Sequence, residues 1–220
     1  MPTPADIIDV ISTRLSFPKK TVAQQDRLLV INGQRKISGR GRSAMASPRD
    51  AAALLIAVAA TPISGPAINI ANYQSYANLH AVHLPQGKLE SWRNIVSLRD
   101  LPDGHTLLEA LSRIITCLSK GALLADGNGL MTPQREYPHH INVHVDLYAP
   151  VSRATVTIER TTENSSEPEF AEALHYFRTI DDGEPIVPLD VQIDFAQTRS
   201  FGIRTLWSLA QLFDVGAQSK

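Results

Sequence analysis

Side chains that bind phosphates and contact base edges are concentrated near the start of this sequence. Between residues 15 and 43 there are seven Lys or Arg and a single acid, Asp26. Lys and Arg pair with phosphate oxygens, and Gln can make two parallel hydrogen bonds to an adenine edge. This composition predicts binding to a polyanion, and the alternative is a solvated basic surface without a partner. The candidate contact residues are Lys19, Lys20, Thr21, Gln24, Gln25, Arg27, Arg35, Lys36, Arg40 and Arg42.

The charge of the chain is distributed unevenly along its 220 residues. Residues 1–60 contain nine Lys or Arg and four Asp, a surplus of five positive charges. The whole chain has a formal net charge of −1, so the remaining residues carry −6. A polyanion is therefore attracted to the first segment and weakly repelled by the second. The content of 43% hydrophobic residues is enough to build a core, so we expect the chain to fold.

Two short helices are predicted to position the first candidate residues. The motif TPAD at residues 3–6 supplies an N-cap, a first-turn proline and an approximate capping box for a helix over about 4–15. Phe17-Pro18 interrupts this helix, and apolar spacing predicts a second helix over about 19–32. The lysines and glutamines then lie at the exposed start of the second helix, where backbone N–H groups also favour phosphate.

A basic, glycine-rich segment is expected to follow these two helices. The segment QRKISGRGRSAMA at 34–46 has no helical periodicity and predicts a β-hairpin or an extended loop. Ser47, Pro48 and Asp50 then supply the cap, the first-position proline and the third-position acid of another helix. This third helix is expected to end before Pro62.

A helix, a turn, a helix, a basic hairpin and a helix thus follow one another within residues 4–60. The residues that define this pattern are Thr21-Val22, Asp26-Arg27-Leu28, Gly33, Ser38-Gly39-Arg40-Gly41-Arg42 and Ser47-Pro48-Arg49-Asp50. On these residues the segment resembles the winged helix-turn-helix domains of the MerR-like class, including those of phage and mobile-element regulators. The resemblance implies that the second helix enters the major groove of duplex DNA. It also implies a wing that places Arg40 and Arg42 against the DNA backbone or in the minor groove.

The remainder of the chain is predicted to contain both helices and strands. The apolar stretch at 68–84 argues against a disordered linker, and helices with apolar stripes are predicted over about 104–120 and 202–213. Alternating apolar and polar residues predict a hairpin within 141–158, and a further strand is predicted over 187–196. The two apolar stripes are candidates for a dimer interface, with the core of one chain as the alternative.

These elements predict an α+β protein with an N-terminal winged helix-turn-helix, followed by helices packed on a small, mostly antiparallel sheet. We assign residues 1–61 to the DNA-binding domain and residues 62–220 to an α+β domain for oligomerisation or partner binding.

Other candidate chemistries are weaker. His140, His144 and Asp146 share one face of a predicted strand and could converge on a metal, but the same alternation is typical of the polar face of a half-buried strand. Nucleotide loops, nucleophile elbows and zinc-ligand spacings are missing from the sequence, so we predict no enzyme activity, no metal and no cofactor. Arg199 and Arg204 flank the start of the last helix, where a structural role is favoured over a second phosphate contact.

The sequence therefore predicts a sequence-specific, duplex-DNA-binding transcriptional regulator of bacterial or phage origin that acts as a dimer or higher oligomer. We expect a cytoplasmic, nucleoid-associated protein, because no leader-like segment and no run of about 20 apolar residues is present. One alternative is an architectural or packaging factor, excisionase-like or small-terminase-like. Another is a protein-interaction module whose basic patch contacts an acidic protein, and residues 62–220 could also bind a protein partner.

Overall fold

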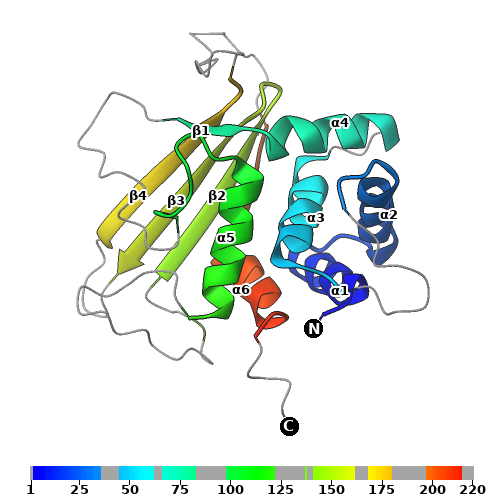
Figure 1. Cartoon of the computed structure of the whole chain (residues 1–220), viewed down its shortest axis with the longest axis horizontal. Helices are drawn as coiled ribbons and strands as arrows, with labels where there is room; N and C mark the ends of the chain where they lie inside the picture. The colour runs from blue at the N-terminus through cyan, green and yellow to red at the C-terminus, as the bar shows by residue number, and fades with distance from the viewer. Residues whose placement is uncertain are drawn as a thin grey trace.

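The structure is a computed structural model that describes residues 2–35, 45–61, 66–82, 98–121, 137, 141–161, 168–179 and 197–214. Six helices and five strands in these ranges confirm the α+β class (Figure 1). The helices are α1 (Pro4–Leu15), α2 (Lys19–Ile31), α3 (Pro48–Ala60), α4 (Pro66–Ala77), α5 (Leu107–Ser119) and α6 (Ile203–Gln211). The strands are β1 (His80–Val82), β2 (Ile141–Ala149), β3 (Arg153–Thr161), β4 (Pro168–Phe177) and β5 (Gln197–Gly202).

Capping boxes fix the start of three helices. The side chains of Thr3, Ser47 and Thr106 accept a hydrogen bond from the backbone N–H three residues later, and the acid at that position accepts one from the cap N–H. Each box satisfies two N–H groups that the helix itself leaves without a partner. The predicted bounds of the first two helices are confirmed to within one residue, and α3 ends at Ala60 as expected.

The five strands form one antiparallel sheet in the order β1-β4-β3-β2-β5. β2 and β3 form the predicted hairpin, and their register pairs Val145 with Val156. Along β2 the apolar residues are buried, while Asn142 and His144 between them are exposed. The apolar face of the sheet therefore faces the core, and α5 and α6 lie in front of it in Figure 1.

α3 lies between the N-terminal helices and the helices that cover the sheet. Every residue from Ala51 to Ala60 is buried, and the helix packs against α2, α4, α5 and α6. The buried side chains of α1, α2 and α3 belong to the same hydrophobic cluster as those of α5, α6 and the sheet. The first 60 residues thus share a core with the rest of the chain, and the domain boundary at residues 61–62 stays a prediction.

The apolar stripes of α5 and α6 are part of this monomer core. Leu107, Leu111, Ile114 and Ile115 of α5 are fully buried, and α6 packs against both α5 and α1. Of the two alternatives predicted for these stripes, the structure shows the monomer core. The dimer interface suggested for these faces is therefore wrong for the buried side chains.

Two elements differ from the sequence prediction or go beyond it. Residues 66–77 form the helix α4, where the sequence predicted ordered structure of no particular type, and residues 168–177 form the strand β4, which the sequence left ambiguous. The strand predicted over 187–196 and most of the predicted hairpin, residues 36–44, lie outside the described residues. Within the part of the chain that is described, no helix has both the length and the apolar character needed to cross a lipid bilayer.

Candidate nucleic-acid interface

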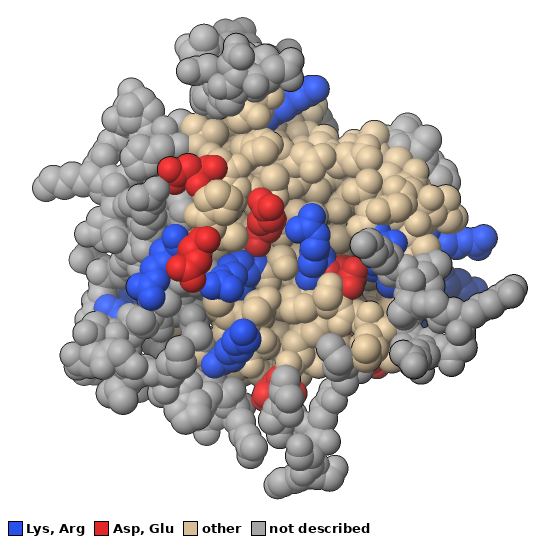
Figure 2. Space-filling model, in the orientation of Figure 1, with Lys and Arg blue, Asp and Glu red and all other residues tan. Residues whose placement is uncertain are grey.

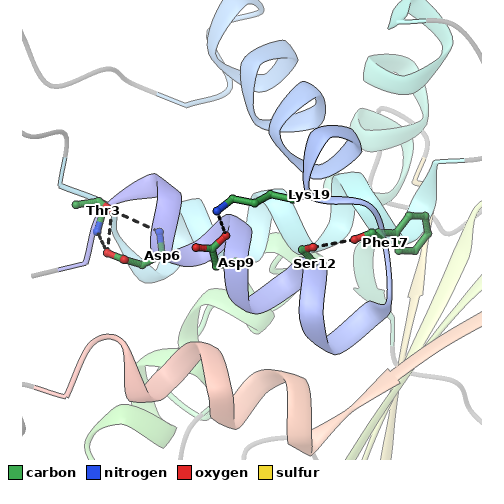
Figure 3. A network of polar contacts seen from close by, with 6 residues as sticks. All are labelled: Thr3, Asp6, Asp9, Ser12, Phe17 and Lys19. Carbon is green, nitrogen blue, oxygen red and sulfur yellow. Dashed lines mark hydrogen bonds and ion pairs between the residues drawn. The ribbon is translucent and has the colours of Figure 1, made fainter.

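The connection between α1 and α2 consists of three residues that local hydrogen bonds hold in place (Figure 3). Ser16 adopts the left-handed conformation with φ 57° and ψ 34°, which turns the chain at the end of α1. The Ser12 hydroxyl donates to the Phe17 carbonyl at 2.8 Å, and the Phe17 N–H donates to the Ser12 carbonyl at 3.1 Å. The ammonium of Lys19 forms an ion pair with the carboxylate of Asp9. These contacts fix the start of α2 relative to α1.

The second helix has one buried face and one exposed face. Val22, Gln25 and Leu29 are buried, and they recur at the spacing of one helix face. On the opposite side, Lys20, Gln24, Arg27 and Ile31 are exposed. We call these four residues the exposed face of α2. Their spacing of four, three and four residues places them in one line along the helix.

The exposed face of α2 contains two cations and one amide and no acid. Figure 2 shows Lys and Arg side chains projecting at the edge of the molecule where α2 lies, whereas acidic and basic side chains lie next to one another over the middle of the same view. The one acid of the helix, Asp26, is turned away and pairs with Arg35. This face can therefore present positive charge to a polyanion along about two helical turns, from Lys20 to Arg27.

The N-terminus of α2 differs from those of α1, α3 and α5. Its N-cap is Pro18, which makes no side-chain capping hydrogen bond, and its first turn contains no acid. The Pro18 carbonyl accepts from the N–H groups of Thr21 and Val22, at 2.8 and 3.2 Å. Backbone N–H groups at such a helix start, next to two lysines, favour an anionic group.

Two of the predicted contact residues are corrected by their burial. Gln25 is 6% exposed and Arg35 is 8% exposed. Gln25 lies on the buried face of α2, so its amide is not available to a base edge. The Arg35 guanidinium donates to the Asp26 carboxylate at 2.6 Å, and both side chains are largely buried. Arg35 thus holds the segment that follows α2 against the helix, and it does not contribute to an exposed surface.

The other predicted residues divide into three groups. Lys20, Gln24 and Arg27 are brought together on the exposed face of α2, and Lys19 lies beside them with its ammonium already paired to Asp9. Thr21 is half-buried at the edge of this face. The remaining candidates, Lys36, Arg40 and Arg42, lie outside the described residues.

The structure adds residues that the sequence prediction left out. Arg14 in the last turn of α1 and Arg49 in the first turn of α3 are exposed cations. Ile31 is 66% exposed and Met45 is 60% exposed. The apolar pattern of the second helix favoured an inward-facing Ile31, and the structure corrects this. Its spacing from Lys20 and Arg27 could have identified it, because that spacing matches the helical period of the exposed face.

Of the residues considered for a metal site, His144 and Asp146 make a local hydrogen bond. His144 and Asp146 on the polar face of β2 lie 3.0 Å apart between Nε2 and a carboxylate oxygen, and the Ser200 hydroxyl donates to the same oxygen. Within the described residues, no group of three His, Cys, Asp or Glu side chains could hold a metal ion. His139 and His140 lie outside these residues.

Comparison with known proteins gives no match, whether with protein-family models, with curated proteins or with solved structures. The resemblance of residues 4–60 to MerR-like winged helix-turn-helix domains therefore stays a prediction. The structure shows two helices joined by a three-residue turn, and the exposed face of the second helix is basic and contains no acid.

Proposed function

We propose that this chain is a sequence-specific, duplex-DNA-binding transcriptional regulator, in which α1, the turn and α2 act as a helix-turn-helix. The observation that carries the proposal is the exposed face of α2. A recognition helix must bury one face in its own protein and offer the other to the major groove, and α2 has both faces at the required spacing. A connection of three residues matches the turn length typical of helix-turn-helix motifs.

Within this proposal the residues of α2 have distinct roles. Lys20 and the uncapped N-terminus of the helix bind a phosphate, and Arg27 binds a second phosphate or a guanine edge. Gln24 lies between them and contacts a base, most favourably adenine through its amide. Arg40 and Arg42, in the segment 34–46 that the sequence predicts as a wing, contact the DNA backbone or the minor groove within this proposal.

Dimerisation is part of the same proposal. One helix-turn-helix contacts too few base pairs to distinguish its site from the excess of genomic DNA, so such proteins pair on two half-sites. Because the stripes of α5 and α6 are buried within one chain, the surface that pairs two copies lies elsewhere.

Selection of bound sequences from a randomised duplex pool tests this function. We expect an enriched motif with two half-sites, which the intact protein binds at least about 1,000-fold more tightly than random DNA. Gln24→Ala should relax the preference at one base position per half-site and leave the other positions unchanged.

The competing functions give different results. An architectural or packaging factor forms higher oligomers on the selected duplex or shows strong bend-dependent mobility. A protein-interaction module with a basic patch retains no DNA at all. Either result would reject the regulator proposal.

A further inference from the structure

A cavity lies where the end of α3 and the helix α4 meet the sheet. Its volume is about 200 Å³, and it is bounded by the last residues of α3, by α4, by the turn between β2 and β3, and by β5. The residues that line it are Ala59, Ala60, Asn72, Tyr76, Leu147, Ala149, Pro150, Ser152, Gln197 and Arg199. Half of these residues are apolar and the other half carry hydroxyl, amide or guanidinium groups, so the wall offers an apolar surface together with polar groups that can orient a ligand.

Among the described residues that line this cavity, Arg199 is the one cation. Its side chain is half-buried, and its Nη1 donates to the carbonyls of Thr61 at 2.7 Å and Ala59 at 3.3 Å. These carbonyls belong to the C-terminal end of α3, whose partial negative charge holds the guanidinium in place. The hydrogen bonds to the end of α3 therefore hold the charge of Arg199 in place at the cavity wall.

The positive charge of Arg199 has no acidic partner among the described residues. The Lys and Arg side chains that form ion pairs there are Lys19, Arg35 and Arg113, and Arg199 is not one of them. A guanidinium has five N–H donors, so the contacts of Nη1 leave donors for an occupant of the cavity. The side-chain amides of Asn72 and Gln197 likewise make no hydrogen bond to any described residue.

We propose that this cavity binds a small monocarboxylate with a short apolar or aromatic part. A carboxylate matches the planar fork of Arg199, and one cation balances one negative charge. A phosphate monoester would bring a charge of about −1.5 to −2 at neutral pH, which a single arginine does not balance. The apolar wall, made by Ala59, Ala60, Leu147, Ala149 and Pro150, accepts the hydrocarbon part. The volume suits a molecule of about the size of benzene with one headgroup.

Thermal-shift and calorimetric titrations of the full chain with benzoate test this site, with benzamide and inorganic phosphate as matched probes. We expect benzoate to raise the melting temperature, with a shift that grows with the logarithm of its concentration above the dissociation constant, and the neutral amide and phosphate to have no comparable effect. Arg199→Gln should weaken benzoate binding at least about tenfold, because it removes a charge-assisted hydrogen bond. Arg178→Gln, an exposed arginine after β4, removes the same charge elsewhere and should leave the affinity unchanged.

A second variant keeps the test valid if Arg199→Gln does not fold. Gln197 is an exposed residue of the cavity wall, so Gln197→Trp fills the cavity without disturbing the core, and it should abolish benzoate binding. Equal stabilisation by benzoate and benzamide, tighter binding of phosphate than of benzoate, no response of the intact chain to benzoate, or full affinity in the Gln197→Trp variant would overturn the proposal.

Discussion

Because the chain has one shared core, removing a buried side chain from α1 should destabilise the C-terminal half of the chain as well. Ile11 is fully buried on α1, which packs against α6, and the buried side chains of both helices belong to one cluster. Ile11→Ala removes three buried carbons, worth about 0.8 kcal/mol each by transfer, and leaves a cavity. We expect a loss of about 2–5 kcal/mol in the free energy of unfolding. Ile31→Ala is the matched control, because Ile31 is 66% exposed on α2 and should change stability by less than about 0.5 kcal/mol.

Urea unfolding followed by the fluorescence of Trp207 measures this effect. Trp207 lies on α6 and is 7% exposed, and a Trp92→Phe background makes it the one tryptophan of the chain. For a slope of about 3 kcal/mol per molar urea, a loss of about 3 kcal/mol lowers the midpoint by about 1 M. The shared core would be refuted if the Trp207 midpoint stayed unchanged in Ile11→Ala while circular dichroism detected a separate loss of helical signal at lower urea.

Three further predictions concern buried polar groups. Burial lowers the pKa of His105 below its unfolded value of about 6.5, so the unfolded chain takes up the proton more readily. The free energy of unfolding should therefore fall as the pH drops below about 6.5. The melting temperatures at pH 5 and pH 7 should differ less for His105→Gln than for the unchanged chain. Asp26→Asn leaves a buried arginine without its counter-ion and should cost about 3–5 kcal/mol in chemical denaturation, whereas Asp9→Asn in the exposed pair should cost less than about 1 kcal/mol. Burial raises the pKa of the Cys117 thiol, so a thiol reagent should modify it at the rate of unfolding, and rapid modification of the native chain would contradict its buried position.

The elements with local start and stop signals could be predicted from the sequence. The boxes at Thr3 and Ser47 place the starts of α1 and α3, because the capping contacts join residues three apart. Strict alternation in β2 likewise predicts a half-buried strand. β4 shows where local signals fail: its segment AEALHYF contains good helix formers, and its pairing with β3 on one side and β1 on the other makes it a strand.

The candidate site could be predicted in part. Lys20, Gln24 and Arg27 follow from helical spacing, and the same spacing places Gln25 with Val22 and Leu29 on the buried face. The pairing of Arg35 with Asp26 could not be predicted, because it depends on how the chain leaves α2. The cavity at Arg199 also needs the tertiary structure, since its walls come from α3, α4 and the sheet.

Fluorescence anisotropy with a random duplex at several salt concentrations tests the central claim, that the exposed face of α2 binds DNA. The proteins compared are the intact chain, a Lys20→Gln/Arg27→Gln variant and the Arg178→Gln control. The account predicts salt-dependent binding by the intact chain and the control, and a slope of log affinity against log salt that is smaller by about 2 in the double variant. An intact chain that does not bind at low salt, or a double variant with unchanged affinity and slope, would contradict it.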